Sequence, residues 1–134
     1  MFINRPTTNY VGLFGHTNTG ATIKNIGIVN ANITGNSDVG GLVGKSYKTT
    51  IANAYATGSI SGLSFVGGLV GSSYQGSITN ADATSAVNGT GAMIGGLVGS
   101  NWETHITNTY ATGSVNRAGS HVGGLVGSSY QGSI

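Results

Sequence analysis

The sequence predicts an all-β fold, a parallel β-solenoid (β-helix) of about four and a half rungs of 27–28 residues. Three observations lead to this prediction: an internal repeat, alternation of small apolar and polar residues within each repeat, and a composition with 25 glycines and only 6% charged residues. So many glycines would destabilise helices throughout the chain. We expect a right-handed coil, because parallel crossover connections are nearly always right-handed.

The repeat is clearest in the hexapeptide at residues 39–44, whose counterparts start at Val66, Ile94 and Val122. The successive steps are 27, 28 and 28 residues, and a shorter version starts at Val11. Repeats of this length are typical of solenoids, in which each unit buries its apolar face against its neighbours. We therefore expect one domain over residues 1–134, with rungs at about 11–38, 39–65, 66–93 and 94–121 and a partial rung at 122–134.

The second half of each repeat predicts a half-buried strand, since side chains alternate between the two faces of a strand. The alternate residues that face outward near position 55 are mostly polar and include Tyr55. The alternate residues that face inward are small and apolar, and in the second rung they are Ala54, Ala56, Gly58 and Ile60. Inward residues this small fit a narrow coil whose opposing walls lie close together.

Stacked rungs place equivalent residues about 4.8 Å apart, so that repeated residues form columns along the axis. Asparagine is expected at a corner, because it tolerates the left-handed region and its stacked amides can hydrogen-bond. The paired glycines before each leucine indicate a bend or bulge, and parity leaves the direction of Val43 and its counterparts open. The expected columns are Ile23, Ile51, Ile78, Ile106 and Ile134; Leu13, Leu42, Leu69, Leu97 and Leu125; and Asn25, Asn53, Asn80 and Asn108.

Composition argues against several functional classes. The net charge of +2 comes from scattered residues, so nucleic acid is not an expected partner. The chain has no cysteine, hence no disulfide framework or thiolate metal site. No segment is long and apolar enough to be a transmembrane span, and the first residues do not have the pattern of a secretion signal.

Catalytic and metal-binding patterns are also missing. Solenoid glycosidases need clustered carboxylates, whereas Asp82 and Glu103 lie in non-equivalent columns. The three histidines also lie at repeat positions that differ from one another. The repeated glycine segment lacks the Lys and Ser/Thr of a phosphate-binding loop. We therefore expect no enzyme activity, no catalytic residue, no cofactor and no metal. We interpret the acidic residues and histidines as polar surface; they are Asp38, Asp82, Glu103, His16, His105 and His121.

Two columns are candidate binding surfaces. The first is aromatic and could contact the faces of sugars, although its rings could equally stack on one another to shield a corner; it consists of Tyr47, Tyr74, Trp102 and Tyr130. The second is an outward threonine column, which could order water and bind ice or could simply reflect β-propensity; it consists of Thr57, Thr84 and Thr112.

The repeated Gly-Gly-Leu-Val-Gly segment, followed by Ile-x-Asn-x-Tyr-Ala-Thr-Gly-Ser, resembles the GLUG repeat family. The resemblance covers nearly the whole chain, with Asp82 and Ser85 departing from the Tyr and Gly of that pattern. Such repeats occur in bacterial surface and secreted proteins, including filamentous-haemagglutinin-like adhesins and accessory regions of IgA-cleaving metallopeptidases. The resemblance implies an extracellular or cell-surface location and a chain that is a fragment of a longer array.

Three functions remain open. The first is a non-catalytic structural stalk of an adhesin, and the second is an adhesive surface for host or matrix glycans or host proteins that uses the aromatic column. The third is ice binding through the threonine column. Expected partners also include further rungs of a parent chain or a second copy at the ends, because uncapped strand edges favour association.

Overall fold

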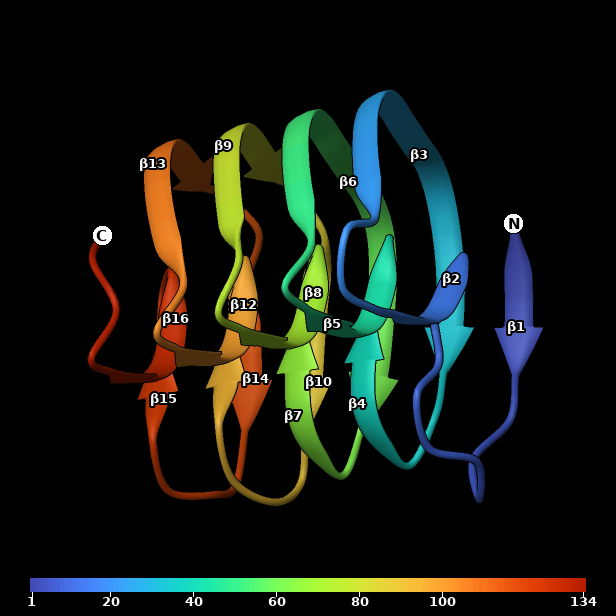
Figure 1. Cartoon of the computed structure of the whole chain (residues 1–134). Coiled ribbons are helices and arrows are strands. Elements are labelled where there is room, and N and C mark those ends of the chain that lie inside the picture. Colours follow the sequence, from blue (N-terminus) through green and yellow to red (C-terminus); the bar gives the residue numbers. More distant parts are fainter.

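The computed structural model describes residues 1–134, the side chain of Arg117 excepted. It confirms the predicted all-β solenoid, in which about five turns stack side by side and the two termini lie at opposite ends (Figure 1). Every strand pairing is parallel. No helix capable of crossing a membrane is present among the described residues.

Three parallel sheets run along the stack, each receiving strands from successive rungs. Sheet A contains β1 (Phe2–Asn4), β3 (Thr22–Thr34), β6 (Thr50–Gly62), β9 (Ser77–Ala83), β10 (Ala86–Gly89), β13 (His105–Ala111) and β14 (Val115–Arg117). Sheet B contains β4 (Ser37–Gly40), β7 (Ser64–Gly67), β11 (Ile94–Gly95) and β15 (Val122–Gly123). Sheet C contains β2 (Phe14–Thr17), β5 (Val43–Tyr47), β8 (Val70–Tyr74), β12 (Val98–Trp102) and β16 (Val126–Tyr130).

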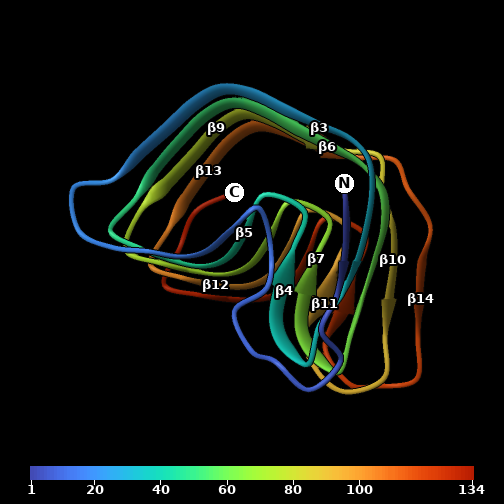
Figure 2. The same cartoon turned by 90° about the vertical axis from the view of Figure 1, so that its right-hand side faces the viewer.

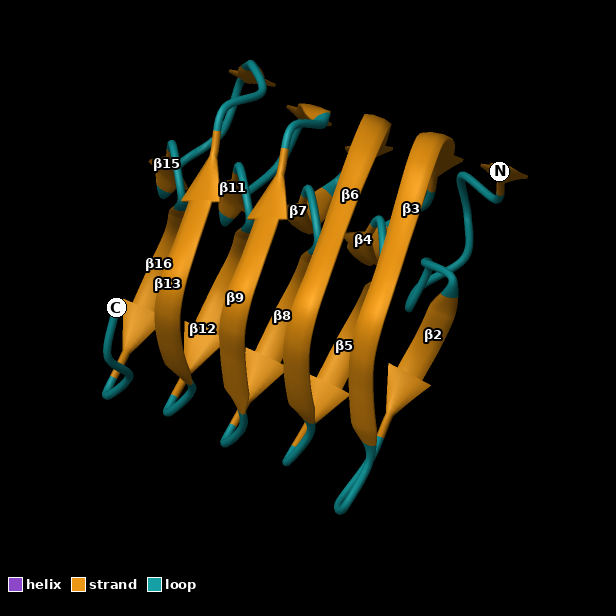
Figure 3. Cartoon of the chain, turned by 90° about the horizontal axis from the view of Figure 1, so that it is seen from above, coloured by secondary structure: helices purple, strands orange, loops and turns teal.

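Each rung is a bent loop, as the view along the stack shows (Figure 2). The long strands of sheet A arch over sheet C and then turn down beside sheet B, so sheets B and C meet at an inner corner (Figures 2 and 3). The chain passes from sheet B to sheet C at the paired glycines, as the sequence predicted. A Cβ atom on Gly41 would lie 2.5 Å from the carbonyl oxygen of Gly68 and 2.9 Å from Cβ of Ala56. Glycine is required here because the opposing walls are in contact.

The asparagine column lies at a bend of the long strands, as predicted. Asn25, Asn53, Asn80 and Asn108 all have positive φ, between 50° and 56°. Their amides form a ladder of hydrogen bonds on the outside: Asn53 donates to Asn25 over 3.1 Å, Asn80 to Asn53 over 3.3 Å, and Asn108 to Asn80 over 3.2 Å. This residue therefore supplies both the left-handed backbone and a contact between rungs.

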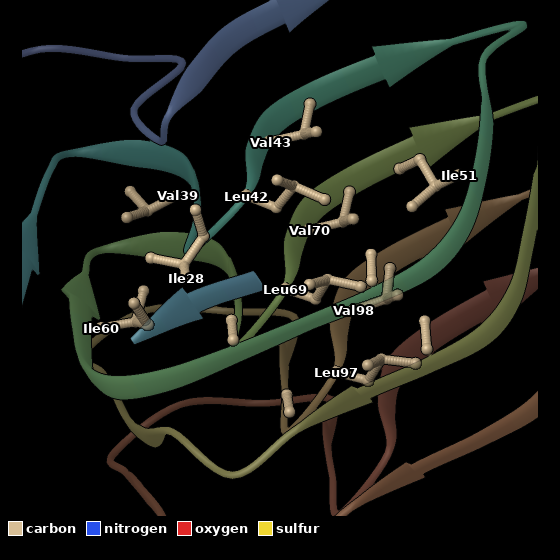
Figure 4. Packing of buried hydrophobic residues seen from close by; sticks show 14 of the residues in the cluster. Ile28, Val39, Leu42, Val43, Ile51, Ile60, Leu69, Val70, Leu97 and Val98 are labelled. Atoms are coloured by element: carbon tan, nitrogen blue, oxygen red, sulfur yellow. The ribbon is translucent and has the colours of Figure 1, made fainter. Parts of the chain in front are cut away.

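The predicted leucine and isoleucine columns are buried in the middle of the stack (Figure 4). The direction of Val43, which parity left open, is inward, and Val43, Val70 and Val98 are 0% exposed. The first and last members of the predicted columns differ from this pattern. Leu13 is 41% and Ile134 65% exposed, because no further rung covers them in this structure.

Gly58 differs from the prediction that it shares the inner face with Ala56. Ala56 is fully buried, as expected. Gly58 instead has φ +125°, and a Cβ atom there would meet the backbone of Ala31 in the preceding rung. The strand bends at this point, so strict alternation of side chains stops. In β3 the same bend holds one extra residue, which shifts the register between Ile28 and Ala31.

Candidate functional site

The four predicted aromatic residues lie side by side on one edge of the solenoid. Each is the last residue of its strand in sheet C, where the chain leaves the sheet for a turn. The register pairs Tyr47 with Tyr74, Tyr74 with Trp102, and Trp102 with Tyr130. We call these four residues the aromatic ladder.

Three rings of the aromatic ladder, those of Tyr74, Trp102 and Tyr130, contact one another along the axis. The centroids of Tyr74 and Trp102 are 6.3 Å apart with an interplanar angle of 23°, and those of Trp102 and Tyr130 are 4.2 Å apart with an angle of 33°. The Tyr74 and Trp102 rings are therefore stacked, whereas the Trp102 and Tyr130 rings are tilted against each other. Exposure rises toward the C-terminal end, to 42% for Trp102 and 49% for Tyr130, so the accessible aromatic surface is concentrated there.

A cluster of one lysine and several aromatic rings joins the aromatic ladder to the inner corner between sheets B and C. The Nζ atom of Lys45 lies 5.0 Å from the ring centroid of Tyr74 and 5.6 Å from that of Tyr10. Tyr10 also stacks on His16, with centroids 5.8 Å apart. Lysine over an aromatic face is stabilising by about 0.5–1 kcal/mol at exposed sites. Sequence analysis missed this cluster, whose members occupy different positions of the repeat.

The same corner brings Asp38 to Ser72. Asp38 occupies the position of Tyr10 one rung later, since Val11 pairs with Val39. Ser72 likewise occupies the position of Lys45 one rung later, since these two residues pair. The carboxylate of Asp38 accepts hydrogen bonds from the hydroxyls of Ser72 and Ser37. The corner therefore holds its two walls together by a different polar or aromatic contact in each of these rungs.

A second feature that sequence analysis missed is a buried polar column inside sheet C. The hydroxyl of Ser46 donates to Ser73 over 3.0 Å, and the hydroxyls of Ser73 and Thr104 lie 2.9 Å apart. Asn101 donates to Ser129 over 3.2 Å, continuing the column into the last rung. Among the described side chains, no buried polar atom lacks a hydrogen-bond partner. These buried polar groups satisfy their hydrogen bonds with one another, which is typical of a structural network.

The threonine column occupies equivalent positions on the outer side of sheet A. The side chains of Thr84 and Thr112 are exposed, whereas Thr57 is half-buried. The Thr57 hydroxyl oxygen accepts a hydrogen bond of 2.9 Å from the backbone N–H of Asn30. The register places Asp82 next to Tyr55 and Tyr110 in the adjacent column, so the surface beside the threonines changes from rung to rung.

The remaining titratable residues are separated from one another. Glu103 accepts a 2.7 Å hydrogen bond from the side-chain amide of Gln75, one rung away. His105 lies 2.7 Å from the hydroxyl of Ser133, and His121 lies 3.2 Å from that of Ser120. In the described part of the chain, His, Asp and Glu form no group of three or more that could hold a metal ion.

Comparison with known proteins gives one match. The model of the GLUG motif matches three segments, residues 35–61, 64–88 and 90–116, which together span more than half of the chain. No curated protein and no solved structure matches it. The three matched segments step along the sequence as the structural rungs do, and each contains one aligned set of core residues. The chain belongs to the GLUG motif family.

Proposed function

We propose that this chain is a non-catalytic structural stalk of a bacterial cell-surface or secreted protein. The observation that carries the proposal is that the same columns continue unbroken through successive rungs. This holds for the inner leucine column, with Leu42, Leu69 and Leu97 at 0% exposure, and for the outer asparagine ladder. Each rung is held to its neighbours by a backbone ladder and repeated side-chain contacts. A rod built this way gains length in equal steps with each repeat.

A stalk must resist bending, and three separate contacts along the axis support that. The buried isoleucine and leucine columns fill the interior, the Ser46–Ser73 pair links rungs inside sheet C, and the aromatic ladder links them at its edge. The termini lie at opposite ends of the stack (Figure 1), so the module would separate whatever it connects. Charged residues make up only 6% of the chain, which fits a weakly charged spacer.

The stalk proposal is tested by removing one whole repeat. Spin labels are placed at Lys24→Cys and Thr107→Cys, exposed members of one column in a chain without other cysteines. Three rung steps of about 4.8 Å separate these positions, or about 14 Å. Deleting residues 66–93 should leave a folded rod and reduce the separation to about 10 Å, measured by dipolar broadening in electron paramagnetic resonance.

The matched control is a deletion of half a repeat, residues 66–79, which shifts the register and should prevent folding. A narrow distance distribution before and after the whole-repeat deletion supports a rigid spacer. A broad distribution, or an unchanged separation after the deletion, would rule out a stalk of uniform rungs.

An adhesive surface is the second candidate, and the exposure of Trp102 and Tyr130 at adjacent positions favours it. Exposed aromatic rings with nearby polar groups can contact the apolar faces of sugars or of a host protein. The test compares binding to arrays of glycans and host glycoproteins by the native chain and by a variant with all four ladder residues changed to alanine. Binding that is lost in a folded variant would support adhesion. Absence of binding by the native chain would leave the structural stalk as the supported function.

A further inference from the structure

Asp82 differs from the other two acidic residues in its contacts. Asp38 accepts hydrogen bonds from two serine hydroxyls, and Glu103 accepts one from the side-chain amide of Gln75. In the part of the chain that the structure describes, the carboxylate of Asp82 takes part in no hydrogen bond and no ion pair. Aspartate is also disfavoured within strands, and Asp82 lies inside β9. This carboxylate therefore contributes little to the fold and keeps its charge for an external group.

Asp82 lies between two tyrosines on the outer face of sheet A. The register pairs it with Tyr55 of β6 on one side and with Tyr110 of β13 on the other, and these strands run side by side in Figure 3. Tyr55 is 43% and Tyr110 56% exposed. Because neighbouring strands lie about 4.8 Å apart, both tyrosines start within one strand spacing of the carboxylate. We call these three residues the Tyr–Asp–Tyr column.

The side chain of Tyr55 is directed away from Asp82. The register pairs Tyr55 with Gly27 in the preceding rung, and a Cβ atom added to Gly27 would collide with the phenol end of the Tyr55 ring. The ring thus extends over Gly27, on the side opposite Asp82. As a result, Tyr55 borders the Asp82 carboxylate without covering it.

The surroundings of the Tyr–Asp–Tyr column are polar and uncharged. Outward side chains of one strand follow one another at about 6.6 Å, so the asparagine ladder lies on one side of the column and the threonine column on the other. Within residues 53–57, 80–84 and 108–112, Asp82 is the one charged residue. Asn80 and Thr84, the outward residues on either side of it, are both exposed. A single negative charge therefore lies at the centre of a neutral surface.

We propose that this surface binds a protein partner through an arginine side chain of that partner, which pairs with Asp82 and packs against Tyr110. A guanidinium group can form two parallel hydrogen bonds with one carboxylate and can also stack on an aromatic ring. A lysine ammonium group does not offer this planar, two-fold geometry. The combination of one carboxylate with a neighbouring exposed ring therefore fits arginine best.

The arrangement has the composition of a protein-binding surface. Tyrosine and arginine are enriched among the residues that contribute most to protein interfaces, and such residues are surrounded by others of nearly neutral contribution that exclude water. Here the asparagine and threonine side chains supply that surround. The inference goes beyond the stalk, because a rod can carry this surface without any change in its buried columns. It is also separate from the aromatic ladder, which lies at the edge of sheet C.

The proposal is tested by titrating the isotope-labelled native chain with two short peptides and following backbone N–H signals by two-dimensional NMR. One peptide is acetyl-Gly-Arg-Gly-amide, and the other has citrulline, which has the shape of arginine without its charge. The arginine peptide should cause saturable shifts at Asp82, Thr84 and Tyr110. It should bind about five-fold more tightly than the citrulline peptide. A lysine peptide should bind more weakly than the arginine peptide, because an ammonium group cannot form the paired hydrogen bonds.

Two variants locate the site. Asp82→Asn should weaken binding of the arginine peptide about five-fold, and Tyr110→Leu about three-fold. Glu103→Gln removes a carboxylate elsewhere on the solenoid and is the matched control, which should bind like the native chain. Unchanged spectra away from the substituted residue show that each variant is folded. Equal binding of the arginine and citrulline peptides would overturn the proposal. So would unchanged binding by Asp82→Asn, or an equal loss in Glu103→Gln, because net charge alone would then explain the attraction.

Discussion

Gly68 lies opposite Ala83 across the interior of the solenoid, so closely that a Cβ atom on Gly68 would be 2.9 Å from Cβ of Ala83. A Cβ atom added to Gly41 or to Gly96 would lie at the same distance from Cβ of Ala56 or Ala111, respectively, so the close approach repeats in each inner rung. The small alanines of sheet A and the second glycine of each pair therefore form one unit. Their joint size determines how closely the sheet A wall approaches the inner corner.

Gly68→Ala should consequently destabilise the fold. The added methyl would meet both Ala83 and the carbonyl oxygen of Gly96, and overpacking of this kind costs about 1–3 kcal/mol. The free energy of unfolding, measured by urea denaturation, should fall by at least that much. The matched control is Gly124→Ala at the same repeat position in the last rung, where nothing lies within 4 Å of the added atom. Equal effects at both positions would contradict this account.

The asparagine ladder leads to a second prediction, which separates backbone from side-chain effects. Asn53 has φ 51° and takes part in two ladder hydrogen bonds. Asn53→Gly keeps the left-handed backbone accessible and should cost about 1 kcal/mol of unfolding free energy through the lost hydrogen bonds. Asn53→Ala should cost about 1–2 kcal/mol more, because alanine disfavours the left-handed region. If thermal denaturation found the two variants equally stable, the backbone role of Asn53 would be wrong.

The sequence predicted the fold class and the columns because the repeat period equals one turn of the solenoid. Once rungs stack one repeat apart, Ile51, Leu69 and Asn80 must each meet their counterparts. The direction of Val43 could not be predicted, since the preceding glycine pair interrupts alternation. The structure shows that Val43 points inward and is fully buried in the core.

The candidate site could be predicted only in part, for a related reason. The aromatic ladder repeats at one position, so its residues could be identified from their spacing. The contacts of Lys45 with Tyr10 and Tyr74 depend instead on the angle between sheets B and C and on side chains at different repeat positions. A one-dimensional period carries no information about that angle, and whether any ligand binds there depends on chemistry that differs among rungs.

A third prediction compares two members of the leucine column. Leu69 is fully buried between two rungs, whereas Leu13 is covered from one side only. Leu69→Ala should lower the unfolding free energy by about 2–5 kcal/mol, the usual cost of removing a buried leucine side chain. Leu13→Ala should cost less than about 1 kcal/mol at concentrations where the chain is monomeric. Denaturant titrations of both variants check this, and similar losses would show that the ends of the stack are as well covered as its middle.

The last prediction concerns the coupling between Trp102 and Tyr130. Their centroid distance of 4.2 Å is the shortest in the aromatic ladder. Aromatic pairs in close contact contribute about 0.5–1.5 kcal/mol beyond the area that they bury. A double-mutant cycle with Trp102→Ala and Tyr130→Ala should therefore give a coupling energy in that range, measured by denaturant unfolding followed by far-ultraviolet circular dichroism.

The control cycle pairs Trp102→Ala with Tyr55→Ala, on a strand of another sheet, and should be additive to within about 0.5 kcal/mol. Additivity in both cycles would mean that the ladder rings are neighbours without stabilising one another.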